Sequence, residues 1–472
     1  MAERGFAVAP SDAALREVAA TPPAPAAPPP AVRDLRELPW SSIDNAESKD
    51  LDQVEWAERA DDGAVRVLVG IADVDALVPR GSAVDADAAH NATSVYAGAD
   101  VFPMLPLALS ADRTSLLEGE DRLAIVVELR VAADGTVERA DVYRALLRNR
   151  AKLAYDDVGA WLERGGAPPE SVARVPELSA QILLQYDAAR RLQAERDRAG
   201  ALDFETIEAR PVTKGGAVVG LAVVHKNAAR ELIEDFMIAA NVAIARFLEA
   251  HGSSGIRRVV REPERWARIV EIARRYGDAL PDAPDSRALA AFLARRRAAD
   301  PLRFPDLSLS IVKLMGPGEY ALDRPGHDPG GHFGLAAEDY SHATAPNRRY
   351  ADLVTQRLVK AVLAGAPQPY TDDELGSLAA HCTEREDAAR AVERTVRKTA
   401  AALLLASRIG DTFDAIVTGA ARKGTFVRLL DPPAEGRVVR GEAGMDVGER
   451  VRVRLLSVDP ERGYVDFEGT EG

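Results

Sequence analysis

The chain is poor in cysteine and in long apolar runs, and each shortage excludes a class of protein or site. Of its 472 residues only one, Cys382, is a cysteine, so neither an intramolecular disulfide nor a cysteine-rich zinc site can form. No stretch approaches the ~18 consecutive apolar residues of a membrane-spanning helix, and the first residues, MAERGFAVAP, lack the basic and apolar regions of a secretory signal. We therefore expect a protein that enters no membrane and works in the cytoplasm.

Positive charge and aromatic residues are also scarce. The formal net charge of −14 argues against nucleic-acid binding through a general excess of basic residues, although an acidic shell around a basic channel is compatible with it. Because aromatic residues make up only 5% of the chain, any ring in a binding site carries much of the contact area. The 47% of apolar residues is enough for a large buried core.

The order of patterns along the chain divides it into three parts. Residues 20–32, ATPPAPAAPPPAV, indicate an extended or disordered arm, so we assign 1–35 to this arm and expect ordered structure to begin near Leu35. Short β-like runs followed by helical patterns predict a mixed α/β (α+β) domain over 36–408. About five short alternating strands then predict a small all-β barrel of the OB type over 409–472.

The segment SIDNAESKDLDQV, residues 42–54, places three aspartates close together. Asp44, Asp50 and Asp52 fall at i, i+6 and i+8, and even offsets put side chains on one face of an extended chain. Crowded carboxylates repel one another unless a cation lies among them, and Mg²⁺ binds such oxygens together with phosphate oxygens and water. The segment predicts a magnesium site suited to phosphodiester hydrolysis, although by itself it fits an acidic surface turn better.

A basic counterpart lies far along the chain, in YSHATAPNRRYADLVTQR, residues 340–357. A Ser/Thr/Pro turn leads there into a helical pattern that carries Arg348 and Arg349 near its start. A helix N-terminus attracts anions and a guanidinium can bind two phosphate oxygens, so the motif is typical of a phosphate clamp. On local grounds an arginine pair that is solvated or paired with acids is the more frequent explanation.

Together, the acidic and basic motifs resemble the aspartate and arginine motifs of the RNase II (RNB) family of exoribonucleases. Four stretches between them are similar to family blocks and stand in the family's order: TSVYAGADVFPMLPLALSADRTSLLEGEDRLAIVVEL, AKLAYDDVGAWLE, GALDFETIEA and ELIEDFMIAANVAIARFL. The resemblance implies a barrel-like sheet wrapped by helices, followed by an S1 domain. It also implies Mg²⁺-dependent, processive 3′-to-5′ hydrolysis of single-stranded RNA to nucleoside 5′-monophosphates, in RNA decay or processing.

The resemblance assigns expected roles to individual residues. Asp44, Asp50 and Asp52 match metal-site aspartates, of which Asp50 and Asp52 are taken as catalytic together with Arg348, which matches the arginine that steadies the scissile phosphate. The residues expected to contact RNA are Tyr96 and Phe204 as a stacking pair, Glu234 and Glu393 as acids of the channel, Arg349, and Arg422, Lys423 and Phe426 beside Arg428 on a hairpin of the barrel. Core packing is the alternative for the two rings, and an ordinary charged hairpin is the alternative for the barrel.

Two departures from the family pattern keep other functions open. Gln53 gives DLDQ where DLDD is usual; its amide oxygen can still bind Mg²⁺ but brings one negative charge less, and Asn347 replaces the isoleucine of SPIRRY. Gln53 thus leaves a catalytically impaired RNA-binding protein as one alternative, and a nuclease acting on DNA is another, which no sequence feature distinguishes. Family members also carry two cold-shock-type barrels in front, where this sequence has the Pro/Ala-rich arm, so we expect weaker grip on unstructured RNA and better access to structured RNA. We expect a monomer.

Overall fold

The computed structural model describes residues 1–21, 27–98, 100–205, 208–214, 217–224, 226–301, 303–421, 424–445 and 447–470. Its body is built on six strands in the order β1-β8-β2-β3-β4-β7, and β7 also pairs with β8, so that the sheet closes on itself. The strands are β1 (Arg33–Asp34), β2 (Trp40–Asp44), β3 (Gln53–Arg59), β4 (Val65–Ala72), β7 (Asp121–Val131) and β8 (Val137–Ala154). The predicted barrel-like sheet is thus confirmed.

The sheet closes because β8 is long. Its 18 residues pair with β7 along the first part of the strand and with β2 along the last part. Its first part pairs with β7 from Val137 to Arg148, and its last part runs parallel to β2 from Asn149 to Ala154. The Val- and Ile-rich strand β4 is buried along nearly its whole length, because it has neighbours on both edges and packs on both faces. The end of β2 and the start of β3, which the aspartate motif connects, therefore lie together at one edge of the closed sheet.

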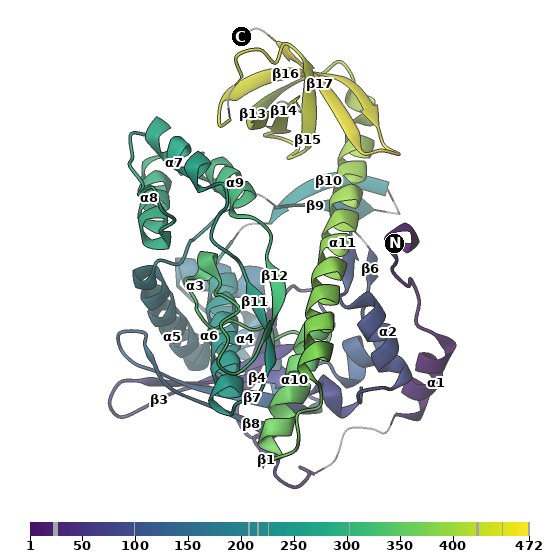
Figure 1. The fold of residues 1–472 in the computed structure, drawn as a ribbon, viewed down its shortest axis with the longest axis vertical. Coiled ribbons are helices and arrows are strands. Elements are labelled where there is room, and N and C mark those ends of the chain that lie inside the picture. Colours follow the sequence, from purple (N-terminus) through teal and green to yellow (C-terminus); the bar gives the residue numbers. More distant parts are fainter. Residues whose placement is uncertain are drawn as a thin grey trace.

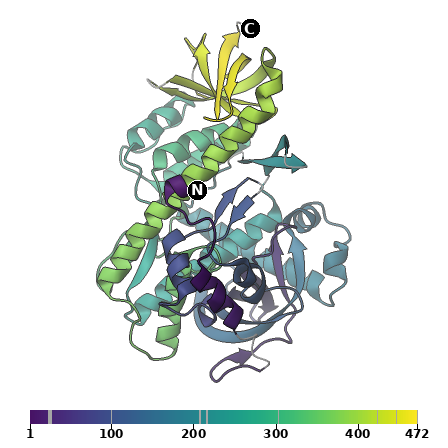
Figure 2. The same ribbon diagram turned by 90° about the vertical axis from the view of Figure 1, so that its right-hand side faces the viewer.

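Helices cover this closed sheet, as Figures 1 and 2 show. They are α2 (Ala83–Asn91), α3 (Tyr155–Arg164), α4 (Glu170–Ala173), α5 (Leu178–Ala199), α6 (Ala228–Ala250), α10 (Tyr350–Leu363) and α11 (Asp372–Leu405). Helix α6, largely buried, contains the block ELIEDFMIAANVAIARFL; it begins at the cap residue Asn227, whose side chain accepts a hydrogen bond from the Arg230 amide. No helix in the described ranges is long and apolar enough to span a membrane.

A separate helical lobe lies beside the body, formed by α7 (Trp266–Arg275), α8 (Ser286–Ala299) and α9 (Phe304–Met315). It has an apolar cluster of its own, centred on Trp266, Phe292 and Phe304. The described residues of the body also form three two-stranded antiparallel sheets: β5 (Val95–Ala97) with β6 (Asp100–Phe102), β9 (Glu208–Lys214) with β10 (Ala217–Val224), and β11 (Gly255–Val259) with β12 (Glu319–Asp323), which flank the helical lobe in the sequence.

The C-terminal residues form a closed five-stranded barrel in the order β13-β14-β15-β17-β16, which confirms the predicted OB-type domain. Its strands are β13 (Thr412–Ala421), β14 (Gly424–Leu429), β15 (Glu435–Arg440), β16 (Arg450–Asp459) and β17 (Tyr464–Thr470). Helix α11 runs from the body up to this barrel (Figure 1), and its last residues, Ala401, Ala402 and Leu405, belong to the barrel's core. The two domains thus share one helix.

Ordered structure begins well before Leu35, so that expectation was wrong. Residues Asp12–Ala20 form α1, capped by the Ser11 side chain, and Val18 packs into the main core. The guanidinium of Arg113 donates to the carbonyls of Val18 and Thr21, both at 2.9 Å. The Pro/Ala-rich composition of 20–32 obscured this, and residues 22–26 lie outside the described part of the chain.

Candidate active site

The aspartate motif forms the loop between β2 and β3. Asp44 is the last residue of β2, and Asp50 and Asp52 come immediately before β3. Leu51, which is 1% exposed, anchors the loop: its amide donates to Ser115 Oγ at 2.9 Å, and its carbonyl accepts from the Leu116 amide at 3.0 Å. The aspartates are therefore held at the rim of the closed sheet.

The fold brings the arginine motif against this loop. Asp52 is 2% exposed; its Oδ1 accepts a hydrogen bond from the Asn347 amide at 3.0 Å, and its Oδ2 lies 3.2 Å from Arg348 Nε. Burial raises the pKa of Asp52 to about 7, while the Arg348 guanidinium and the Asn347 amide act in the opposite direction. The side chain of Arg348 is 43% exposed, so part of its guanidinium remains accessible to an anion.

Asn347 fits the fold although it departs from the family pattern. Its side chain is fully buried, and the Thr114 hydroxyl donates to its Oδ1 at 2.5 Å. Its Nδ2 has no hydrogen-bond partner among the described residues. The substitution therefore leaves the contact of the residue 347 amide with Asp52 intact.

The remaining aspartates lie close enough to influence one another. Asp44 Oδ1 accepts from the Asn45 amide at 2.6 Å and from the Ser48 hydroxyl at 3.0 Å, and Asp50 Oδ2 accepts from the Tyr96 hydroxyl at 3.5 Å. Burial raises the pKa of Asp44, and the charge of Asp50 adds to this rise, as it does at Asp52.

This donor chemistry fits a divalent cation, although in the described ranges no three His, Cys, Asp or Glu side chains converge as a ready-made cage. The mutual repulsion of Asp44, Asp50 and Asp52 is what a hard cation would relieve, and phosphate oxygens and water can supply the other ligands. Gln53, at the start of β3 and 9% exposed, is the neutral oxygen donor beside them.

Glu55 is a residue of this region that sequence reasoning missed. It lies in β3, two residues after Gln53, and is fully buried, with neither carboxylate oxygen hydrogen-bonded to a described residue. Burial raises its pKa well above the ordinary value, and Asp44 adds to the rise. The detectable pattern was a charged residue inside the otherwise buried strand segment QVEWA.

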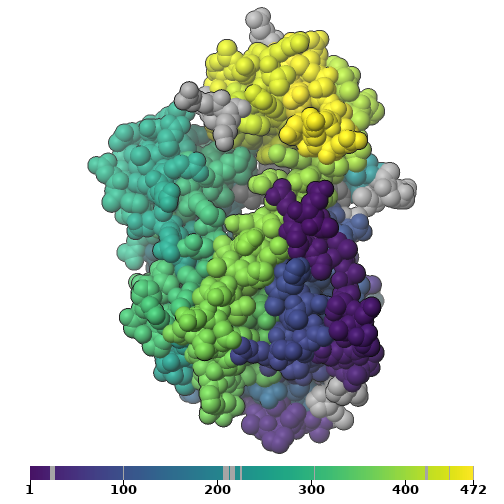
Figure 3. Space-filling view, turned by 45° about the vertical axis from the view of Figure 1, so that its right-hand side comes forward, coloured from purple at the N-terminus to yellow at the C-terminus, as the bar shows by residue number. Residues whose placement is uncertain are grey.

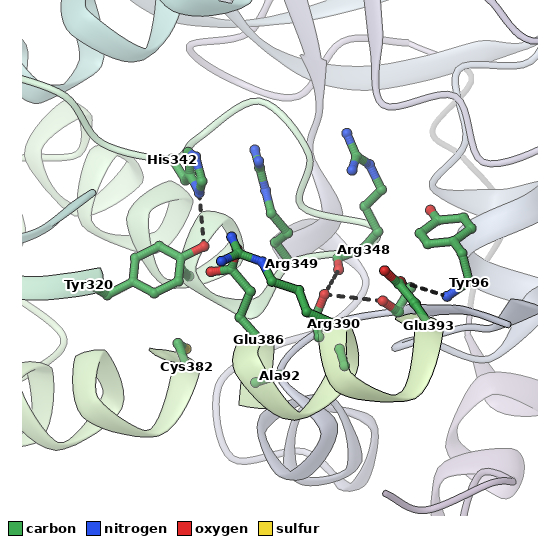
Figure 4. A pocket seen from close by; sticks show the side chains of 14 residues that line it. Ala92, Tyr96, Tyr320, His342, Arg348, Arg349, Cys382, Glu386, Arg390 and Glu393 are labelled. Carbon is green, nitrogen blue, oxygen red and sulfur yellow. Dashed lines mark hydrogen bonds and ion pairs between the residues drawn. The ribbon is translucent and has the colours of Figure 1, made fainter. Parts of the chain in front are cut away.

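A cavity of about 240 Å³ (Figure 4) is lined by Arg348 and Tyr96, which contact Asp52 and Asp50 of the aspartate loop. It is lined on one side by the arginine motif and by Tyr96, and on the other by one face of α11, from which Glu386, Arg390 and Glu393 project. Glu393 Oε1 accepts from the Tyr96 amide at 3.1 Å, which fixes the hairpin β5–β6 against α11. The ring of Tyr96, 42% exposed, is available for stacking.

Two further members of the arginine motif have structural partners in this cavity. Arg349 binds Asp352 Oδ1 at 2.6 Å, so it is committed to holding the start of α10. His342 shares a 2.8 Å hydrogen bond with the Tyr320 hydroxyl, and burial lowers its pKa well below the ordinary value, so the ring is neutral. Of the predicted cationic groups here, Arg348 is therefore the better suited to bind phosphate.

The structure does not bring all predicted residues to the aspartates. Phe204 is half-buried and packs against the cluster of Trp266 in the helical lobe, in agreement with core packing, the alternative explanation for this ring. Glu234 projects from α6, and its Oε2 lies 3.3 Å from Lys226 Nζ. Their roles toward RNA remain predictions.

On the barrel, Phe426 of β14 is 40% exposed, whereas Arg422 and Lys423 lie outside the described residues. The expectation that Arg428 belongs to the same RNA surface was wrong. Arg428 is buried and pairs with the buried Asp306 of α9, Nη2 to Oδ1 at 2.5 Å. It ties the barrel to the helical lobe.

The closed sheet, with its acidic β2–β3 loop meeting an arginine before α10, is the architecture of an RNB domain, and the RNB domain family matches residues 32–365. The chain belongs to this family, and residues 411–469 match the C-terminal S1 domain of RNase II-type exonucleases. Ribonuclease R 1 of Lactococcus lactis is 29% identical over 466 residues, and ribonuclease R of Thermotoga maritima is 31% identical over 471 residues. The matches cover 92% of this chain, which spans 56% and 64% of those relatives' lengths.

Solved structures show the same fold. Mycoplasma genitalium RNase R in complex with ribose-methylated single-stranded RNA matches with a TM-score of 0.89 and 22% identity, over 99% of this chain and 76% of that one. Yeast Ssd1, a pseudonuclease, matches with a TM-score of 0.68 and 18% identity, over 90% and 52% of the two chains. The fold thus occurs in both a nuclease and a pseudonuclease, so function must be argued from the site.

Proposed function

We propose that this protein is a Mg²⁺-dependent exoribonuclease that hydrolyses single-stranded RNA from the 3′ end and releases nucleoside 5′-monophosphates in the cytoplasm, as a monomer. The observation that carries the proposal is the contact of Asp52 with Arg348 and the Asn347 amide, which unites the two family motifs. RNB-family exoribonucleases depend on divalent metal ions, and the oxygen donors Asp44, Asp50 and Asp52 suit Mg²⁺.

Different residues of the chain would bind the cation and the scissile phosphate in such a reaction. Asp44, Asp50, Asp52 and Gln53 would hold the cation, which when bound activates water and neutralises charge on the phosphate. Arg348, partly exposed beside the buried Asp52, binds a non-bridging phosphate oxygen and steadies the scissile group.

The exposed aromatic rings of Tyr96 and Phe426 would bind RNA independently of its sequence. Tyr96, whose hydroxyl reaches Asp50, stacks on the 3′-terminal base, since stacking holds any base at ~1–3 kcal/mol. Phe426 on the barrel offers a second stacking surface, with Arg422 and Lys423 on the same hairpin as its predicted cationic neighbours. Phe204, Glu234 and Glu393 complete the set of predicted channel residues.

The test is a 5′-labelled single-stranded RNA incubated with the protein in Mg²⁺ or EDTA, beside an Asp52→Asn variant and a DNA of the same sequence. We expect Mg²⁺-dependent conversion of RNA to a short limit product, lost in Asp52→Asn and absent with DNA. Asp61→Asn, an identical change at an exposed β3–β4 turn, serves as the matched control and should be fully active.

The second candidate is an RNA-binding protein without hydrolysis, which the missing charge at Gln53 favours. It predicts that the wild-type protein binds the labelled RNA in Mg²⁺ but leaves it intact. That result would refute the exoribonuclease proposal.

A further inference from the structure

The first residues of the chain pack against the back of the candidate site. Phe6 is 3% exposed and forms an apolar cluster with Val95 of β5 and with Ala389 and Val392 of α11. Figures 2 and 3 show this N-terminal stretch lying on α11. Phe6 therefore joins two elements that line the cavity from opposite sides.

Polar contacts hold this N-terminal stretch against both α11 and the end of α2. The guanidinium of Arg385 on α11 lies 3.9 Å from the centre of the Phe6 ring, and its Nη1 donates to the Arg4 carbonyl at 3.1 Å. On the other side, Asn91 Oδ1 accepts from the Ala7 amide at 3.0 Å and its Nδ2 donates to the Ala7 carbonyl at 3.1 Å. Two hydrogen bonds to one residue leave the backbone of Ala7 little freedom.

Gly5 makes the tight approach to α11 possible. Its φ of +76° lies in the left-handed region, which favours glycine, and a Cβ there would come within 3.0 Å of Arg385 Nη1. The chain can therefore turn at Gly5 and insert Phe6 between α11 and β5.

The segment held in this way continues directly into the site. Asn91 ends α2, and the cavity is lined just after it by Ala92, Thr93, Ser94 and Tyr96. The Ser94 amide donates to the Arg348 carbonyl at 3.0 Å, and the Thr93 hydroxyl donates to the same carbonyl at 3.3 Å. A displacement of this wall would therefore move both Tyr96 and the backbone of Arg348.

We propose that residues Met1–Ala7 form a strap that positions the wall Ala92–Tyr96, and that Phe6 is a positioning residue for Tyr96 and Arg348. Val95 lies in the Phe6 cluster while the next residue, Tyr96, lines the cavity, as side-chain alternation along a strand requires. The functional part of this inference rests on the proposed exoribonuclease activity. The strap acts on the 3′ end of the RNA, because the residues that it positions are those proposed to bind the terminal nucleotide.

The test compares Phe6→Ala with Phe6→Leu, which keeps an apolar side chain, and with Val8→Ala, a control at a position that is 58% exposed in the same stretch. The first measurement is backbone hydrogen exchange by mass spectrometry, which needs no activity. We expect faster exchange of residues 92–97 in Phe6→Ala, with the central sheet and α6 unchanged, and wild-type exchange in the other two variants.

The second measurement is steady-state cleavage of labelled RNA together with its binding in EDTA. Since displacement of a positioned group by ~1 Å can cost up to ~100-fold in rate, we expect Phe6→Ala to lower kcat about 10- to 100-fold. Its Kd for a long RNA should stay within about twofold of wild type, because most of the RNA binds elsewhere, and Phe6→Leu should recover most of kcat.

Three results would overturn the strap. These are unchanged exchange of residues 92–97 in Phe6→Ala, faster exchange throughout the body, which would indicate general destabilisation, or an equal loss of kcat in Val8→Ala. If the wild-type protein cleaves no RNA, the proposed function fails, and the exchange measurement still decides whether the strap positions this wall.

Discussion

Removing one partner of the buried ion pair between Arg428 and Asp306 should strongly weaken docking of the S1 barrel on the helical lobe. The two side chains are 7% and 3% exposed; Arg428 binds Asp306 Oδ1, and Asp306 Oδ2 has no hydrogen-bond partner among the described residues. In Arg428→Ala the carboxylate would stay buried without its counter-charge, and breaking such a pair costs ~3–5 kcal/mol. The loss should be largely insensitive to salt, because buried charges are poorly screened.

Removing both charges should cost much less. In Arg428→Met/Asp306→Leu no charge is left unpaired, and apolar replacement of a buried pair is often neutral or stabilising. Asp306 also lies in the first turn of α9, where a negative charge contributes ~0.3–1 kcal/mol, so the double variant should fall within about 1 kcal/mol of wild type. Arg452→Ala, which breaks an exposed pair with Asp414 on the same barrel, should cost at most ~1 kcal/mol.

The assay must separate docking from global unfolding, because a two-domain chain need not unfold in one step. Urea unfolding followed by tryptophan fluorescence gives the stability, and native-state proteolysis of the connection at 406–411 reports barrel docking. A loss below about 1 kcal/mol in Arg428→Ala, or a double variant as unstable as the single one, would refute the reasoning that an unpaired buried charge dominates.

Two further predictions concern the site and the core. Gln53→Asp should lower the Mg²⁺ concentration for half-maximal cleavage at least about tenfold, because a carboxylate ~4 Å from a cation is worth several kcal/mol at an effective dielectric constant near 20. Gln53→Ala is the control. An unchanged Mg²⁺ titration in Gln53→Asp would contradict this prediction. Burial raises the pKa of Asp235 from 3.8 to about 7 in spite of its pairing with Arg196. The folded state then binds more protons than the unfolded state between these values, so the stability from this group is full below pH ~4 and is lost as pH rises through ~7. Urea unfolding at several pH values should show a smaller loss of stability between pH ~4 and ~7 in Asp235→Asn than in wild type, because Asp52 and Glu55 still contribute in the variant. Equal profiles would contradict the prediction.

The sequence was informative where local pattern determines structure. The buried helix α6, the long helix α11 and the five-stranded barrel follow from apolar spacing and turn residues that lie next to each other in the chain. The meeting of Asp52 with Arg348 required more than pattern, and was expected only from the order of the family blocks.

What could not be predicted depends on partners far away in sequence. Whether Arg428 faces solvent or lies buried is decided by Asp306, 122 residues earlier, and the burial of Phe6 depends on Arg385 of α11. Phe204 carries the family pattern for stacking, yet it is partly buried and packs against the apolar cluster of the helical lobe. In each case the local sequence permits two environments, and tertiary packing selects one.

Helix α11 sets a fixed distance between the two ends of the proposed RNA path. It has 34 residues, about 51 Å at ~1.5 Å per residue, and the 12 residues from Glu393 at the cavity to Leu405 in the barrel core (405 − 393) span ~18 Å. An RNA that reaches both sites is held bivalently, so each site raises the effective concentration of the RNA at the other. If the proposed 3′-to-5′ hydrolysis shortens the RNA, its 5′ end would leave the barrel first, and avidity would be lost at a length that depends on this helix. On the proposed function, the length of α11 would thus set the RNA length at which processive degradation gives way to release.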